Sequence, residues 1–201
     1  MSQAPANARR RLRILGLGGS GREGSTCDRA LAMVLAEAER QGAELDIFSG
    51  QLLDLPHYDF ARGRPGLAAM RLLDAVRQAD GIIIATPSYH GGISGAVKGA
   101  LDHLEELREA ERPYLEGRAV GLVVSAHGAQ ALGTTLMALR GVVHALRGWP
   151  TPYGMTINSR EAPLGAQGEE SPAYKAAAAS LAAQVIAFAQ AANAVRQVNA
   201  A

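Results

Sequence analysis

Short apolar segments alternate along the chain with longer segments in which apolar residues recur every three or four positions. Residues 81–85 have the sequence GIIIA and no polar face, which predicts a central parallel strand covered on both sides. Comparable short segments predict four more strands, over residues 12–17, 43–48, 119–124 and 151–157. Helical spacing of apolar residues predicts five helices, over residues 25–42, 67–80, 93–104, 132–146 and 173–195.

This regular alternation of strand and helix predicts an α/β fold, with a parallel sheet between two layers of helices and right-handed crossovers. Ligands of such sheets bind beyond the carboxyl ends of the strands. The loops at residues 18–25, 87–94 and 125–130 each follow a predicted strand, so we expect all three to open on this edge. Residues 1–11 are polar and without periodicity, which predicts a mobile N-terminal arm before a single domain at residues 12–201.

The first loop combines glycines with hydroxyl and guanidinium side chains, in the sequence GGSGREGST at residues 18–26. Because it joins a buried strand to a helix, its free N–H groups and the helix dipole favour an anion. Hydroxyls and one guanidinium suit a phosphate monoester such as that of FMN; they belong to Ser20, Arg22, Ser25 and Thr26. The alternative is that Ser25 only caps the helix and Arg22 is solvated.

Two other phosphate-loop patterns fit this segment poorly. Residues 16–21 satisfy the dinucleotide pattern G-x-G-x-x-G, but that pattern requires an acidic residue at the end of the second strand. Here Asp46 lies inside the predicted strand, and Ser49-Gly50 follow it. A Walker-type loop would need lysine after Gly24, where the chain has Ser25. A dinucleotide-dependent dehydrogenase therefore remains only as an alternative.

The second loop has the sequence TPSYHGGISG at residues 86–95. Its two adjacent glycines, Gly91 and Gly92, would let the backbone approach a flat ligand closely, and Pro87 stiffens the exit from the strand. Backbone N–H and C=O groups of this loop could form hydrogen bonds with the polar edge of an isoalloxazine ring. The alternative is a loop in which Ser94 caps the next helix while Tyr89 packs in the interior.

The two loops together resemble the NADPH-dependent FMN reductase family. Residues 86–102 are similar to its signature TPEYNGSxPGxLKNxLD, and residues 19–25 resemble its phosphate loop GSxRxGS. The resemblance extends over about residues 12–157. The chain departs from the signature at Ser88, His90 and Gly99, where the family has Glu, Asn and Asn. The first two departures affect the expected contacts at the ring edge and the placement of nicotinamide.

Membership of this family implies a flavodoxin-like three-layer sandwich, whose five-stranded parallel sheet has the order 2-1-3-4-5. It also implies an oxidoreductase that binds FMN and passes a hydride from NAD(P)H, NADPH being the expected donor, to a small acceptor. Such acceptors are free flavin, quinones, azo compounds or metal oxyanions, and a flavin-dependent monooxygenase is a further expected partner. Members of the family are commonly homodimers or homotetramers.

The resemblance also transfers the flavin contacts to this chain. The phosphate contacts would come from Ser20, Arg22, Gly24, Ser25 and Thr26. The ring contacts would come from Pro87, Ser88, Tyr89, His90, Gly91 and Gly92, and from Ser125, His127 and Gly128 of the third loop. No catalytic side chain is expected, because the flavin itself performs hydride chemistry.

Composition and charge limit the partners, the class of protein and the compartment that we expect. The net charge is +1 and only nine residues are aromatic, so neither nucleic acid nor a membrane is expected as a partner. The same charge argues against a flavodoxin-like electron carrier, since carriers of this fold are strongly acidic. The single cysteine, Cys27, is interpreted as a buried filler and predicts a reducing compartment, the cytoplasm. No apolar segment of membrane-spanning length and no export signal is expected.

The histidines do not have metal-binding spacing, so no metal site is predicted. His90 and His127 fall on loops of the expected binding edge. His103 and His144 fall on predicted helices, and we expect them at the protein surface or at subunit contacts. No G-x-S-x-G motif is present, so a serine hydrolase is not supported.

Overall fold

Five parallel strands form the centre of the computed structural model, which describes residues 10–22, 24–162, 164–165 and 171–199. They are β1 (Arg13–Gly18), β2 (Glu44–Ser49), β3 (Gly81–Tyr89), β5 (Ala119–Ala126) and β6 (Trp149–Asn158). Their order across the sheet is β2-β1-β3-β5-β6, which confirms the predicted topology. A sixth strand, β4 (Gly92–Ile93), pairs antiparallel with the end of β3 and was not predicted.

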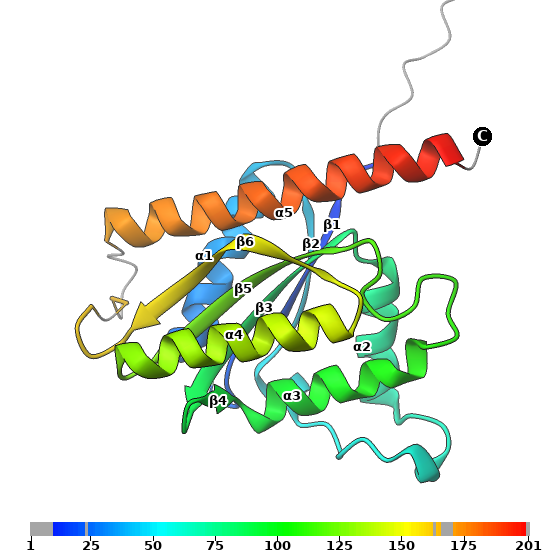
Figure 1. Ribbon diagram of the computed structural model, residues 1–201, viewed down its shortest axis with the longest axis horizontal. Helices are drawn as coiled ribbons and strands as arrows, with labels where there is room; N and C mark the ends of the chain where they lie inside the picture. The colour runs from blue at the N-terminus through cyan, green and yellow to red at the C-terminus, as the bar shows by residue number, and fades with distance from the viewer. Residues whose placement is uncertain (1–9, 23, 163, 166–170, 200–201) are drawn as a thin grey trace, which may run out of the picture.

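Helices cover both faces of this sheet (Figure 1). One face packs against α1 (Thr26–Arg40) and α5 (Pro172–Asn199). The other packs against α2 (Leu67–Gln78), α3 (Gly95–Asp102) and α4 (Ala129–Ala145). Three short 3-10 helices lie at residues 50–53, 60–62 and 103–107. The result is the expected three-layer sandwich.

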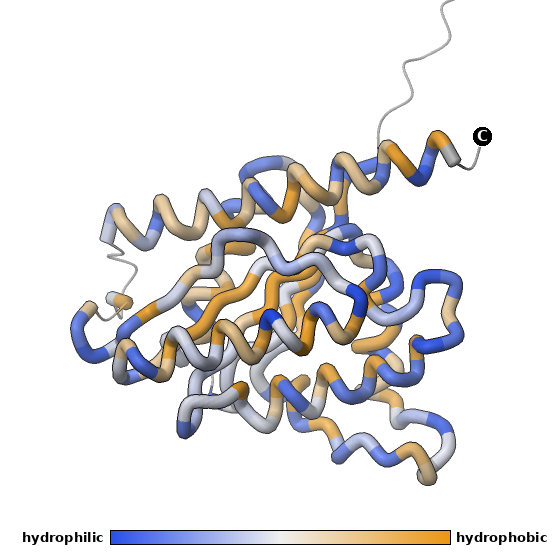
Figure 2. The backbone as a smooth tube through the Cα atoms, viewed as in Figure 1, coloured by the Kyte–Doolittle hydropathy of each residue, from blue (hydrophilic) through white to orange (hydrophobic). Residues whose placement is uncertain are grey.

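The central strand explains why the chain contains an apolar segment with no polar face. Residues 81–87 of β3 are all buried. Ile83 and Ala85 pack in the cluster formed with α1 and α5, whereas Ile82 and Ile84 pack in the cluster formed with α2, α3 and α4. Figure 2 shows this concentration of apolar residues in the strands of the sheet. Because successive side chains of a strand point to opposite faces, a strand covered on both sides has no polar positions.

The C-terminal helix α5 is longer than the predicted helix at 173–195. Residues 172–198 are long and apolar enough, by length and composition alone, to cross a membrane, contrary to the expectation that no such segment exists. In this structure the helix runs along the sheet and buries a row of small and branched residues, including Ala178, Leu181, Val185 and Ala189. It thus contributes one face of the hydrophobic core.

The structure corrects the second predicted loop. Strand β3 continues through Thr86 and Pro87 to Tyr89 and then turns back into β4, so residues 87–94 form a hairpin rather than an irregular loop. Ile93 belongs to β4, and the following helix begins only at Gly95. Ser94 caps that helix as anticipated, because its Oγ accepts a hydrogen bond from the Val97 N–H. The boundary shifts because the strand pairing extends past Pro87.

The position of His103 also differs from the expectation. Its side chain is buried, with 5% exposure, in a segment after α3 that tightens into a 3-10 helix. Its Nε2 lies 2.9 Å from the carbonyl oxygen of Pro56, and the Tyr58 ring packs edge-on against the imidazole. The chain after β2 therefore covers this histidine. His144, on α4, is exposed as expected.

The predicted N-terminal arm is described only in part. Residues 1–9 lie outside the described residues. Arg10 and Arg11, the last two residues of the predicted arm, are hydrogen-bonded to the rest of the chain. The Arg10 guanidinium pairs with the carboxylate of Asp80, and Arg11 Nε donates to the Gly42 carbonyl oxygen. Arg10 and Arg11 therefore belong to the fold, and the expected boundary of the arm after residue 11 is wrong for these two residues.

Candidate active site

A cavity of about 460 Å³ opens at the carboxyl edge of the sheet. Its size lies within the usual range of small-molecule sites, about 300 to 1,000 Å³. Nine of the predicted contact residues line it: Ser20, Arg22, Ser25, Thr26, Pro87, Ser88, Tyr89, Ser125 and His127. The structure thus brings all three predicted loops to one site.

The first loop, residues 18–26, lines part of this cavity and leads directly into α1; we call it the phosphate-type loop. Ser25 is the N-cap of α1: its Oγ accepts from the Asp28 N–H at 3.2 Å, while an Asp28 oxygen accepts from the Ser25 N–H at 3.2 Å. This reciprocal pair is a capping box. The hydroxyl hydrogen of Ser25 remains available to a ligand, so helix capping and ligand binding are compatible roles for this residue. Arg22 is exposed beside it.

The β3–β4 hairpin forms another wall. Ser88 pairs with Ile93 and Tyr89 with Gly92, so His90 and Gly91 are the two residues of the turn. Tyr89 lines the cavity and is 56% exposed, which overturns the alternative in which it packs in the interior. Ser88 Oγ lies 2.7 Å from Thr135 Oγ1 on α4. This bond fixes the hairpin to the helix beside it and turns the Ser88 hydroxyl toward α4.

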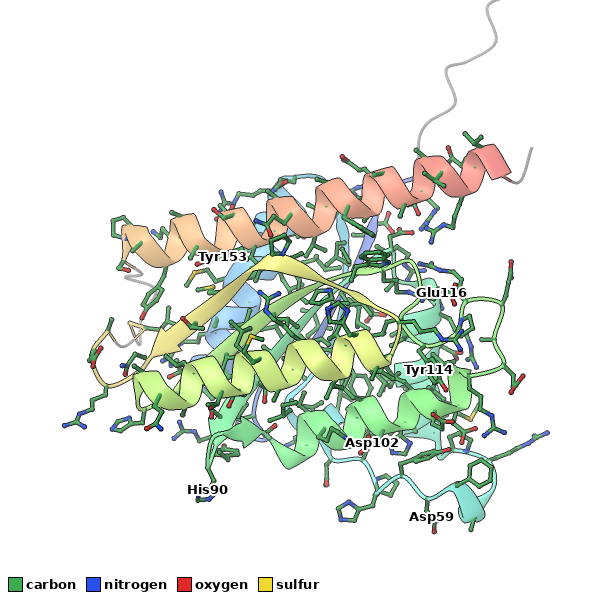
Figure 3. The ribbon with its side chains drawn as sticks, viewed as in Figure 1. Asp59, His90, Asp102, Tyr114, Glu116 and Tyr153 are labelled. Atoms are coloured by element: carbon green, nitrogen blue, oxygen red, sulfur yellow. The ribbon has the colours of Figure 1, made fainter. Side chains whose placement is uncertain are left out.

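The turn itself places a histidine in a strained conformation. Both central residues have positive φ, 53° at His90 and 79° at Gly91, as a type I′ turn requires. Figure 3 shows the His90 side chain at the tip of the hairpin, pointing outward. Asparagine tolerates positive φ better than histidine in such turns, and asparagine is what the family signature carries here.

We therefore expect His90→Asn to raise the free energy of unfolding by about 0.5 kcal/mol, because the turn geometry is unchanged and its strain is reduced. Chemical denaturation measures the effect. His57→Asn is a matched control, since His57 is exposed and is absent from the residues with positive φ. Equal changes in the free energy of unfolding of the two variants would show that strain in the turn does not cause the effect of His90→Asn.

The third wall comes from the ends of β5 and β6. Ser125 and His127 line the cavity as predicted, and Ser159, just after β6, joins them. Ser159 Oγ donates to the Ala126 carbonyl oxygen at 3.1 Å and lies 3.4 Å from His127 Nδ1. Ser159 was not predicted. It is a polar residue that follows the last strand, which is the same signal that identified the first three loops.

Cys27, in the first turn of α1, also lines the cavity. Its thiol is 1% exposed, and burial raises its pKa to about 12. A thiol with such a pKa is protonated near neutral pH and a poor nucleophile. This supports the interpretation of Cys27 as a buried filler.

Five predicted contact residues do not line the cavity: Gly24, His90, Gly91, Gly92 and Gly128. Gly24, Gly91 and Gly92 shape the loops that carry lining residues, and Gly128 is the N-cap of α4. Four lining residues were not predicted: Gly21, Cys27, Ala126 and Ser159. Among the described residues, no group of three or more His, Cys, Asp or Glu side chains could hold a metal ion.

The donor set matches the chemistry of FMN. Hydroxyls, a guanidinium and the first N–H groups of α1 gather at one end of the cavity, where they would suit a phosphate. Pro87, Tyr89 and Ala126 also line the cavity, and such apolar and aromatic groups suit a flat ring. Among the described residues that line the cavity, none is an aspartate or a glutamate.

Comparison with known proteins supports this geometry. Residues 12–161 match the family described as NADPH-dependent FMN reductase, which is three quarters of the chain. The fold is also that of a flavodoxin, WrbA-like protein from Agrobacterium tumefaciens: the TM-score is 0.57 at 22% identity, covering 94% of this chain and 99% of that one. The fold and site thus define a flavodoxin-like flavoprotein, and the chain belongs to the NADPH-dependent FMN reductase family.

Curated relatives carry names of the same class. An FMN-dependent NADPH-azoreductase of Staphylococcus haemolyticus (strain JCSC1435) is 27% identical over 139 residues, 67% of this chain and 70% of that protein. A second, from Staphylococcus aureus (strain USA300), is 32% identical over 129 residues, 61% of this chain and 65% of that protein. Together with the family, these names confirm the predicted class, an NADPH-dependent FMN oxidoreductase.

Proposed function

We propose that this protein is an NADPH-dependent oxidoreductase that holds FMN in the cavity at the carboxyl edge of its sheet and reduces a small acceptor there. The observation that carries the proposal is the convergence of the phosphate-type loop, the β3–β4 hairpin and the end of β5 on one cavity. Bound FMN supplies the hydride chemistry. We assign residues 12–201 to one FMN-binding domain.

The protein's own part is to bind and orient. Ser25 and Thr26 offer hydroxyl donors to the phosphate, and Arg22 offers a charge-assisted contact. The Ser20 hydroxyl donates to the Arg22 carbonyl oxygen at 3.2 Å, so it joins these donors only when it exchanges that bond for one to the phosphate. Pro87 and Tyr89 of the hairpin would contact the ring, while the hydrogen bond between Ser88 and Thr135 keeps the hairpin in place. Residues 125–127 close the remaining side of the ring site.

The relatives' names favour an azo compound as the acceptor. A quinone, free flavin and a metal oxyanion are further candidate acceptors. A flavin-dependent monooxygenase is a further candidate partner. We propose that the protein acts in the cytoplasm as a homodimer or homotetramer. Apolar side chains left exposed on and beside α5 support such assembly: Trp149, Val195 and Val198 are 58%, 60% and 76% exposed.

The first test is the binding of FMN by wild-type protein and by Arg22→Ala. We expect the substitution to weaken FMN binding about tenfold, because it removes a charge-assisted contact with the phosphate. Quenching of flavin fluorescence measures the dissociation constant. Arg64→Ala serves as the control, since Arg64 is exposed and lies outside the cavity.

Addition of NADPH to the anaerobic FMN complex then tests the enzymatic part of the proposal. Rapid bleaching of the flavin absorbance is the expected result, followed by recovery when an azo dye is added. A flavin band that persists would instead indicate an electron carrier or a binding protein. Equal FMN affinity in wild type and Arg22→Ala would remove Arg22 from the phosphate site.

A further inference from the structure

The phosphate-type loop is held from inside by one carboxylate. Asp28, on the first turn of α1, accepts a hydrogen bond from the Ser20 N–H on Oδ1 at 3.1 Å and one from the Ser25 N–H on Oδ2 at 3.2 Å. Its two oxygens therefore hold both ends of the segment between these serines. The Ser25 N–H also donates to the Arg22 carbonyl oxygen, at 3.3 Å. The Ser20 N–H donates to Asp28.

The neighbouring backbone is shaped to fit this carboxylate. Gly19 has φ 102°, and a Cβ there would lie 1.9 Å from Asp28 Oδ1. A side chain at residue 19 would therefore displace the Asp28 carboxylate, and the positive φ itself favours glycine. The next residue of the helix, Arg29, holds the loop from its other side, because its Nη1 donates to the Gly24 carbonyl oxygen at 2.8 Å.

The two serines that Asp28 holds both line the cavity, and the Ser20 Oγ is bonded to the Arg22 backbone within the same loop. Ser20 and Ser25 are 9% and 6% exposed. The N–H groups of Thr26 and Cys27, at the start of α1, have no acceptor within the helix and lie beside them. Asp28 itself does not line the cavity. It is thus placed to fix the donors without contacting the ligand.

We propose that Asp28 is a positioning residue for the flavin phosphate: its carboxylate fixes the backbone of Ser20 and Ser25 so that their hydroxyls and the first N–H groups of α1 converge on one anion. This inference rests on the proposed function, since it concerns the same cavity. It adds a residue outside the cavity lining as a determinant of the preference for a phosphorylated flavin.

Two effects of Asp28 oppose each other, and the experiment separates them. Fixing the loop strengthens phosphate binding, because the donors are ordered before the ligand arrives. The negative charge near the phosphate weakens it. We infer that the first effect dominates, because loss of the carboxylate leaves the Ser20 N–H without its partner and frees the loop to take other conformations.

The test compares FMN with riboflavin, which lacks the phosphate. We expect Asp28→Ala to weaken FMN binding about tenfold and to change riboflavin binding by less than about twofold, so that the preference for FMN falls about tenfold. Asp28→Asn retains one acceptor oxygen and the shape of the side chain, and it should fall between wild type and Asp28→Ala. Flavin fluorescence titration measures all six affinities, those of the three proteins for the two flavins.

A matched control removes a helix cap elsewhere. Ser171 Oγ accepts from the Tyr174 N–H at the start of α5, at 3.3 Å. Ser171→Ala should therefore cost comparable stability and leave the FMN-to-riboflavin preference unchanged. If Asp28 were only a helix cap, its variants would behave like Ser171→Ala.

A second readout is independent of flavin. Amide hydrogen exchange at Ser20 should be slow in flavin-free wild type and at least about tenfold faster in Asp28→Asn. This measurement remains decisive if Asp28→Ala does not fold.

Three results would overturn the inference: an unchanged preference in both variants, tighter FMN binding in both, or equal exchange at Ser20. Failure of wild type to bind either flavin would instead reject the proposed function.

Discussion

Replacing Gly18 with alanine should destabilise the protein by more than about 3 kcal/mol and abolish flavin binding. Gly18 ends β1 at φ 119°, and a Cβ there would lie 2.0 Å from the Ala85 carbonyl oxygen of the neighbouring strand. That oxygen also accepts the Gly19 N–H at 2.9 Å, so it cannot move away without breaking the entry to the phosphate-type loop. Both the backbone conformation and the overlap oppose the substitution.

Chemical denaturation gives the stability change, and FMN titration gives the binding change. Gly21→Ala is the matched control from the same loop, because a Cβ at Gly21 has nothing within 4 Å and its φ is not in the positive region. It should shift the unfolding free energy by less than about 0.5 kcal/mol. Similar stability of the two variants would mean that β1 and β3 do not approach each other this closely.

Replacing Asp80 with asparagine should lower the free energy of unfolding by about 2 to 3 kcal/mol. Asp80 is 2% exposed and lies at the opposite edge of the sheet from the cavity. Its carboxylate accepts from Arg10 Nη2 at 2.7 and 2.9 Å, from the Arg13 N–H at 2.9 Å and from Asn193 Nδ2 at 3.2 Å. Arg196 Nη2 lies 3.6 Å away. An amide cannot accept from all these donors.

This expected loss of unfolding free energy is smaller than the loss on breaking a fully buried ion pair, because the Arg10 side chain is 61% exposed. Asp74→Asn is the control: Asp74 pairs with Arg77 at 2.7 Å but is 58% exposed, so its loss should cost less than about 0.5 kcal/mol. Denaturation midpoints of the two variants provide the comparison. A cost for Asp80→Asn no greater than that of Asp74→Asn would show that the buried carboxylate does not hold α5 to the sheet.

The two edges of the sheet therefore have different roles. Asp80 at the amino edge joins β1 and the C-terminal half of α5, and it supports the sandwich. Gly18 at the carboxyl edge leads into the loop that Asp28 holds. We expect changes at Asp80 to lower stability with little effect on flavin preference, whereas changes at Asp28 should lower the flavin preference in addition to the stability lost with the helix cap.

The sequence alone was sufficient for the elements that depend on local pattern. The apolar segment at residues 81–85 identified the central strand, because only a strand buried on both faces lacks polar positions. The glycine and hydroxyl residues after β1 identified the phosphate-type loop, because parallel strands place such loops at one edge. The sequence offered helix capping by Ser25 and Ser94 as alternatives, and both serines do cap helices, since capping depends on residues three positions apart.

Other features were decided only by the tertiary structure, since they depend on residues far apart in the chain. Pairing with β5 and β4 extended β3 past Pro87, so the expected loop became a hairpin with His90 in its turn. The chain after β2 covered His103, which helical periodicity had placed at the surface. Ser159 entered the cavity because β6 ends beside β5. The sequence by itself thus determined the order of elements, the binding edge and the chemistry of its loops. Packing between distant segments decided which of those side chains face the cavity, because their orientation depends on contacts between residues that are far apart in the sequence.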